Sequence, residues 1–436
     1  MGCGARTDLQ RGGGDGGLDP DSATVDSPCR PGMHAFVYEG PSFFALNSAV
    51  AADYRGGDLR VLFGDSADLG GPPMASLFPR EGEAVHVPVP NPSTSLWFFA
   101  SHGTVYTGAP SLEDRAVILQ AFDWHERRPL QVLELPLPSH LADLSVVIWR
   151  VRRLGPSAYA AHFVNPYEHG REARVVHLVH WSLTADGEAW RVQARTVDLP
   201  PCHLQPWLDL EGTEEAFVAS CFHEGTDGEL ALYMVRIESS GAMESTVERT
   251  GLPNLYDDWT QAFFEERTVP TALGPVTVGS PLTTGRDRSL HVILRTDEGW
   301  QRHTVVDLPV LDVEEASGPY HHLHVDADPD AERIAVAVTE WTNRRWNPTR
   351  HYRVLVVDLS PLPERPPRVE TLLDRFHDPH RAAGPAPPPW DRTQEIISLA
   401  LEPGGSHVWM GVQQRGRPNE RGEPVQDLLG VDLCIP

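Results

Sequence analysis

Histidines recur in one kind of position along this chain, close to the start of an apolar run. Three phrases contain a His-Leu step and a fourth carries two further histidines: Leu137–Leu141, Leu199–Leu204, Tyr320–His324 and Phe376–His380. His322, His324 and Asp326 alternate, so in a strand they would lie on one face. Imidazoles beside a carboxylate suit a divalent metal ion. The candidate metal ligands, for one divalent ion as cofactor, are therefore His203, His322, His324 and Asp326.

A second candidate site, for binding a ligand, is the basic and aromatic segment Glu340–His351 of this acidic protein. Exposed Trp beside Arg and Asn suits stacking on a sugar, pairing with carboxylates or a hot spot for a protein partner. The polar segment 413–421 would lie beside it. The alternative is a solvated hairpin whose Trp folds back on its own sheet. The candidate ligand-binding residues are Trp341, Asn343, Arg345, Trp346, Arg350 and His140.

Composition excludes several kinds of chemistry. The 436 residues carry 61 acidic and 36 basic side chains, a formal charge of -25, and lysine is absent. Schiff-base and phosphate-loop lysines are therefore excluded. The acidity argues against nucleic acid and anionic lipid as partners. We find no nucleophile elbow, phosphate-binding glycine loop or dinucleotide fingerprint, so no catalytic template is present.

The first 32 residues differ from the rest of the chain. They are rich in Gly and Asp and have no apolar face, which predicts a flexible tether. Cys3 at its head is typical of the lipidated start of a mature bacterial lipoprotein, which predicts a periplasmic or cell-surface protein, lipid-anchored or secreted. Membrane contact would then come only through a lipid at Cys3. The alternative is an ordinary exposed cysteine.

Four cysteines remain and allow three pairings. If the two ends of the domain meet, Cys29 can pair with Cys434, and Cys202 and Cys221 would flank one hairpin. Both disulfides suit an oxidising compartment. The alternative is four buried thiols in a cytoplasmic protein.

Residues 33–436 are patterned as short strands. Apolar runs of four to nine residues are bounded by Gly, Pro, Asp or Asn, and no long segment has a helical period. Turns 185–188 and 297–299 predict hairpins. We predict an all-β fold, a seven-bladed β-propeller, with six or eight blades or a pair of β-sandwiches as alternatives. The predicted second strands of the blades begin near Phe43, Trp97, Tyr159, Phe217, His291, Ile334 and Val408.

A polar turn that opens into an apolar strand occurs three times, at 91–100, 328–337 and 402–411. The copy at Asp328-Pro329-Asp330 resembles the WD40-like, TolB-type propeller repeat, in which Ser-Pro-Asp-Gly precedes a strand. The resemblance implies the architecture and no chemistry. In such a ring the connections between blades, and between second and third strands, would lie on one face, which we name the long-loop face. Both candidate sites belong to it.

Three functions follow as hypotheses. The first is an extracytoplasmic binding propeller without enzymatic activity, whose protein or saccharide ligand lies on the long-loop face. The second is a metal-dependent lyase or hydrolase of acidic saccharides at the channel mouth. Such a site would be similar to that of the oligogalacturonate lyases, which are propellers with several metal-binding histidines. The third is a surface-layer or scaffold protein.

Overall fold

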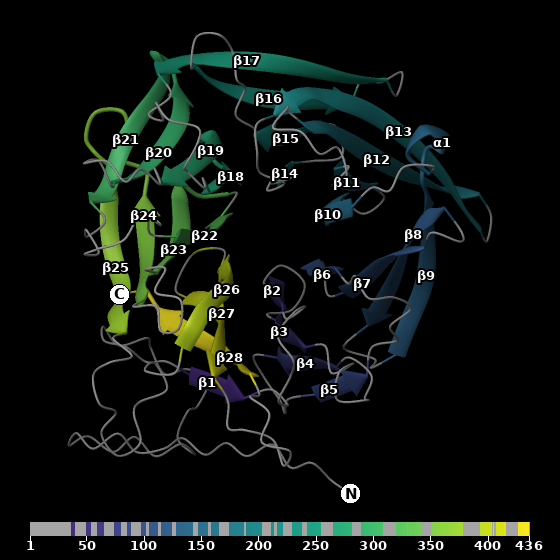
Figure 1. The fold of residues 1–436 in the computed structure, drawn as a ribbon, viewed down its shortest axis with the longest axis horizontal. Helices are drawn as coiled ribbons and strands as arrows, with labels where there is room; N and C mark the ends of the chain where they lie inside the picture. The colour runs from purple at the N-terminus through teal and green to yellow at the C-terminus, as the bar shows by residue number, and fades with distance from the viewer. Residues whose placement is uncertain are drawn as a thin grey trace, which may run out of the picture.

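The computed structural model describes the strands and the short helix bounded below, with residues 115, 137–138, 242, 272–273, 297–298, 330–332, 359–367, 402, 404 and 435. The described strands form seven four-stranded sheets, each a blade of antiparallel neighbours. The blades are arranged around a common axis (Figure 1). The all-β propeller prediction is therefore confirmed.

The blades follow one another in chain order, and their strands are given from the axis outward. Blades 1 to 3 are built as follows: β2 (Ala49–Asp53), β3 (Leu59–Gly64), β4 (Met74–Pro79), β5 (Val85–Pro88); β6 (Trp97–Ser101), β7 (Thr104–Ser111), β8 (Ala116–Asp123), β9 (Arg128–Pro136); β10 (Val147–Gly155), β11 (Ala158–Val164), β12 (Arg174–Asp186), β13 (Ala189–Cys202). The helix α1 (Ser139–Ala142) connects β9 to β10.

Blades 4 to 7 complete the ring. Their strands are as follows: β14 (Glu211–Gly212), β15 (Ala216–Ser220), β16 (Glu229–Ile237), β17 (Met243–Pro253); β18 (Glu265–Thr271), β19 (Gly274–Ser280), β20 (Ser289–Thr296), β21 (Gly299–Asp307); β22 (Tyr320–Asp328), β23 (Arg333–Trp341), β24 (Arg350–Asp358), β25 (Arg368–His377); β26 (Thr393–Leu401), β27 (His407–Arg415), β28 (Gln426–Cys434), β1 (Phe36–Glu39).

The ring is closed by strands from the two ends of the chain. β1 forms the outer strand of blade 7 and pairs with β28 in antiparallel register, with Phe36 opposite Asp432. The first strands of neighbouring blades contact one another around the axis, including β2 with β26. Cys434 ends β28 and is disulfide-bonded. The side chains of the other cysteines lie outside the described residues, so the Cys29–Cys434 and Cys202–Cys221 pairings and the lipid at Cys3 stay predictions.

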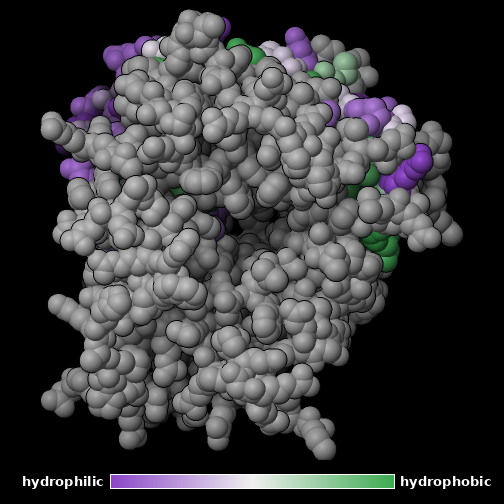
Figure 2. All heavy atoms as spheres, in the orientation of Figure 1, coloured by the Kyte–Doolittle hydropathy of each residue, from purple (hydrophilic) through white to green (hydrophobic). Residues whose placement is uncertain are grey.

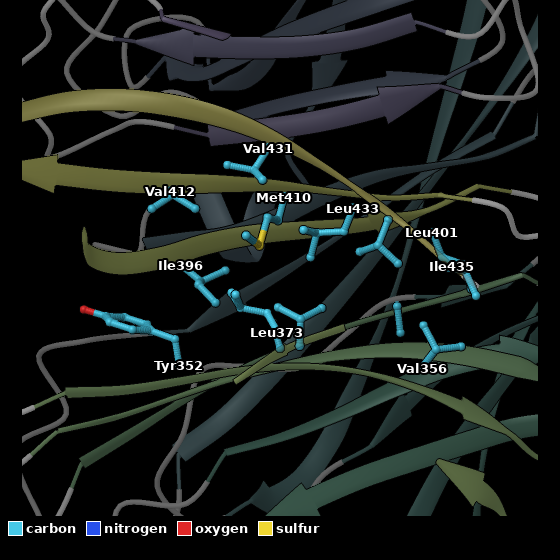
Figure 3. Close-up of a cluster of buried hydrophobic side chains, with 14 residues drawn as sticks. Tyr352, Val356, Leu373, Ile396, Leu401, Met410, Val412, Val431, Leu433 and Ile435 are labelled. Atoms are coloured by element: carbon cyan, nitrogen blue, oxygen red, sulfur yellow. The ribbon is translucent and has the colours of Figure 1, made fainter. Parts of the chain in front are cut away.

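Apolar side chains between adjacent blades hold the ring together. One cluster joins blades 2 and 3 around Trp181, another joins blades 5 and 6, and a third joins blades 6 and 7. Figure 3 shows the third, in which Tyr352, Val356 and Leu373 of blade 6 face Met410 and Val431 of blade 7. Burial of such side chains is the main favourable contribution to folding. The blades whose core side chains the structure describes are thus stabilised through their neighbours.

The turns opposite the long-loop face are linked from blade to blade. Ala272 donates its backbone N–H to Ala331 O at 3.0 Å, which joins the turns of blades 5 and 6. Asp328, which is 3% exposed, continues the linkage to blade 7. Its carboxylate accepts from the N–H of Gly404 at 2.7 Å and from the N–H of Asp330 at 3.1 Å. The buried carboxylate of Asp328 thus holds the turns of blades 6 and 7 together through charge-assisted hydrogen bonds, and we call it the inter-blade clamp.

Four predicted second strands are correct and three are wrong. β11, β15, β23 and β27 begin at or next to Tyr159, Phe217, Ile334 and Val408. Trp97 instead begins β6, the first strand of its blade, and His291 lies in the third strand β20. Phe43 lies outside the described residues, and the second strand of blade 1 is β3. The 91–100 phrase joins two blades, whereas the copies at Asp328 and Glu402 both connect first to second strands.

Blade 5 carries a histidine whose charge is disfavoured by folding. His303 lies in β21, and burial lowers its pKa below the ordinary value of 6.5. The unfolded chain therefore binds a proton more readily, so the free energy of unfolding should fall as pH drops below about 6.5. In His303→Gln this component of the pH dependence should vanish, as measured by urea unfolding between pH 5 and pH 8. An unchanged pH profile would contradict the assignment.

No helix among the described residues has the length and hydrophobicity needed to traverse a lipid bilayer.

Candidate functional site

Strand alternation places the predicted functional segments on one face of the ring. Successive strands of each blade are antiparallel, so a connection from second to third strand leaves at the same end as a connection to the next blade. The segments 342–349 and 416–425 are of the first kind, whereas α1 and residues 203–210 and 378–392 are of the second. In the all-atom view from the same side, the described side chains that are visible lie mainly along the upper margin (Figure 2). Function on rigid scaffolds is usually carried by such connections.

Blade 6 presents a row of functional residue types along its long-loop edge. Tyr320 lies opposite Trp341, Trp341 opposite Arg350, and Arg350 opposite His377. Residues directly opposite each other share a sheet face, with Cβ atoms about 4.5–5.5 Å apart. The row therefore runs from the innermost strand β22 to the outermost strand β25. Its two central members flank the predicted ligand-binding segment.

The row lies on the sheet face that packs against blade 7. Ala335 and Ala337 of β23, and Val354 and Val356 of β24, have the same strand parity as Trp341 and Arg350 and belong to the blade 6–blade 7 cluster. The connection 416–425, which contains most of the predicted polar segment 413–421, belongs to blade 7. Adjacent blades thus carry both predicted polar segments on the same face.

The predicted metal ligands of blade 6 share this sheet face. His322 lies opposite Thr339, His324 opposite Ala337 and Asp326 opposite Ala335, as the alternation predicted. Asp326 already has a structural partner, since its Oδ2 accepts from the backbone N–H of Leu401 in blade 7 at 2.7 Å. Its carboxylate thereby joins two blades.

A charged network on the opposite sheet face fixes the strands that carry the row. His351 is 5% exposed, and its Nε2 contacts Asp374 Oδ1 at 2.5 Å between β24 and β25. Arg353 Nη1 donates to the carbonyl of Asp307 in blade 5 at 3.1 Å. Arg350 therefore precedes an anchored residue, and its backbone position is fixed by contacts within blade 6 and with blade 5.

His140 lies at a different place, between blades 2 and 3. It is exposed on α1, and its ring lies against that of His177 in β12, with centroids 6.1 Å apart. The prediction missed His177. The signal was present, because His177-Leu178 repeats the His-Leu step that marked the other histidines.

Several predicted residues lie outside the described part of the chain. Asn343, Arg345, Trp346 and His203 are among them, and for His322, Trp341 and Arg350 only the backbone is described. Among described side chains, no group of three or more His, Cys, Asp or Glu could hold a metal ion. The metal site of His203, His322, His324 and Asp326 stays a prediction.

No family model and no curated protein matches the chain. Solved structures with similar folds include the WD40 domain of SCAP from fission yeast, at 10% identity, a TM-score of 0.40 and coverage of 92% of this chain and 90% of that one. AofleA from Arthrobotrys oligospora has 11% identity, a TM-score of 0.38 and coverage of 81% and 94%. Aleuria aurantia lectin with alpha-methyl-L-fucoside has 9% identity, a TM-score of 0.38 and coverage of 76% and 96%.

Similarities this weak assign neither a family nor a ligand. The fold rests instead on the sheet topology of the chain itself, in which every described blade has four antiparallel strands and the first described strand completes the last blade. The chain is a β-propeller.

Proposed function

We propose that this chain is a binding propeller without enzymatic activity, whose protein or saccharide ligand lies on the long-loop face. The observation that supports this most directly is the row Tyr320, Trp341, Arg350 and His377 along the edge of blade 6. Aromatic rings offer stacking surfaces, and Arg pairs with carboxylates through two parallel hydrogen bonds. The row suits an acidic ligand with a planar or ring-shaped apolar face.

The predicted tether and cysteines support a location outside the cytoplasm. A lipid at Cys3 would hold the propeller at a bacterial membrane, and residues 4–32 would let it turn toward its ligand. The disulfide at Cys434 is in keeping with an oxidising compartment. Labelling of the mature protein with a fatty-acid analogue tests this, because Cys3→Ser should lose the label.

The metal-dependent lyase or hydrolase is not favoured by any particular contact. Asp326, one of its predicted ligands, has a structural role between blades 6 and 7. The scaffold function likewise has no specific observation behind it.

Binding can be tested on the row and on a matched surface. Trp341→Ala and Arg350→Ala should each weaken ligand binding by at least tenfold, since such aromatic and Arg positions commonly carry about 2 kcal/mol or more of binding energy. Arg368→Ala is the control, because Arg368 is exposed at the opposite end of the same blade. Uronate polymers, neutral glycans and proteins captured from the cell surface serve as probes in biolayer interferometry. Equal effects of all three substitutions would overturn the proposal.

A further inference from the structure

Two histidines meet beside blade 3, away from the row on blade 6. His140 belongs to α1 and His177 lies near the start of β12. Their rings form an edge-to-face contact with an interplanar angle of 69°. His140 is exposed and His177 is half-buried, so solvent reaches this pair. Imidazole nitrogens are the commonest protein ligands for transition metal ions.

The backbone that carries His140 is anchored on both sides. Before it, the carbonyl of Pro136 accepts from Trp181 Nε1 at 2.8 Å, and Leu137 donates its N–H to Arg115 O at 2.8 Å. After it, Leu141 is fully buried in the cluster between blades 2 and 3. The fixed backbone keeps His140 beside His177, so only the side chain of His140 has to be ordered when an ion binds.

The donor atoms of this pair determine which ions it could bind. Two imidazoles suit borderline divalent ions such as Zn²⁺, Cu²⁺ and Ni²⁺, and poorly suit Mg²⁺ or Ca²⁺, which prefer oxygen ligands.

We propose that His140 and His177 form a surface binding site for a divalent transition metal ion. Imidazoles bind such ions at nitrogen-to-metal distances of about 2.0–2.1 Å, which places the ring centres of two ligands at tetrahedral angles roughly 5 Å apart. The rings of His140 and His177 therefore need to approach by about 1 Å. Because His140 is exposed, a rotation of its side chain achieves this without moving the core.

This site does not depend on the proposed binding function. It uses blade 3 and the connection that precedes it, whereas the row belongs to blade 6. It also differs from the predicted site of His203, His322, His324 and Asp326, with which it shares no residue.

Titration calorimetry of the full chain with Zn²⁺, in competition with a chelator, tests the site. His140→Ala and His177→Ala should each remove one bound ion or weaken its affinity by at least tenfold. With Cu²⁺, electron paramagnetic resonance of the wild type should show two coordinated nitrogens, and His140→Ala should lose one.

Two controls keep the result specific. His303→Gln alters a histidine on blade 5 and should leave stoichiometry and affinity unchanged. The triple variant His203→Ala, His322→Ala, His324→Ala should retain the blade 3 ion, which separates the two sites. Because His140 is exposed, His140→Ala should keep the melting temperature of the wild type without metal. Equal binding in the wild type, His140→Ala and His177→Ala, or no Zn²⁺ binding by the wild type, would overturn the proposal.

Discussion

Trp181→Ala should lower the free energy of unfolding by about 3–5 kcal/mol, which is typical of deleting a fully buried aromatic side chain. Trp181 is 0% exposed and packs in the cluster that joins blades 2 and 3. Its Nε1–H also donates to the carbonyl of Pro136 at 2.8 Å. The substitution therefore leaves a cavity and a carbonyl without its partner, and both effects weaken the same inter-blade contact.

Trp181→Phe separates packing from hydrogen bonding. It keeps most of the apolar volume and loses the bond to Pro136, so the expected loss is about 1–2 kcal/mol. Urea unfolding followed by circular dichroism measures both variants. The Pro136 carbonyl lies close to α1, so Trp181→Phe should also weaken Zn²⁺ binding at His140. Equal stability of the wild type and Trp181→Ala would contradict the packing argument.

Asp328→Ala should cost about 2–4 kcal/mol, because two backbone N–H groups lose a charged acceptor in a buried place. These donors belong to Gly404 and Asp330, and the former lies in the neighbouring blade. Asp328→Asn keeps one carbonyl acceptor and should cost about half as much. Thermal and urea unfolding of the three proteins give the comparison.

Asp358→Ala is the matched control for the clamp. Asp358 ends β24, at the turn from the third to the fourth strand of blade 6. It accepts from Ser360 N–H at 3.0 Å, but this bond is exposed and stays within blade 6. Its loss should cost about 1 kcal/mol or less. If Asp358→Ala were as destabilising as Asp328→Ala, the inter-blade role of Asp328 would be wrong.

The fold was largely predictable because its turns are encoded locally. Asp328-Pro329-Asp330 and Glu402-Pro403-Gly404 both mark the step from first to second strand, and Gly404 adopts a positive φ of 75°. The order of strands within a blade was harder to predict. The first six residues of β20 are all buried, so both faces of this strand are covered. The strand therefore lacks the alternation of apolar and polar residues that would distinguish a third strand from a second strand. His291, at its third residue, was therefore assigned to the wrong strand.

The candidate site was predictable only in part. That His322, His324 and Asp326 share a face follows from the period of a strand, and the structure confirms it. That Tyr320, Trp341, Arg350 and His377 form one row depends on register, which links residues up to 57 positions apart through three strand pairings. The His140–His177 contact joins blade 3 to the connection that precedes it in the chain. No local sequence pattern predicts such a contact between distant residues.

The pairing of β1 with β28 also has a consequence for synthesis of the chain. Phe36 lies opposite Asp432, so the last sheet is incomplete until residue 432 has left the ribosome. Until then the blade 6 surface formed by Val354 and Val356 lacks its cover from blade 7. A nascent chain halted before residue 393 would expose this apolar surface, and it is the form we expect chaperones to hold.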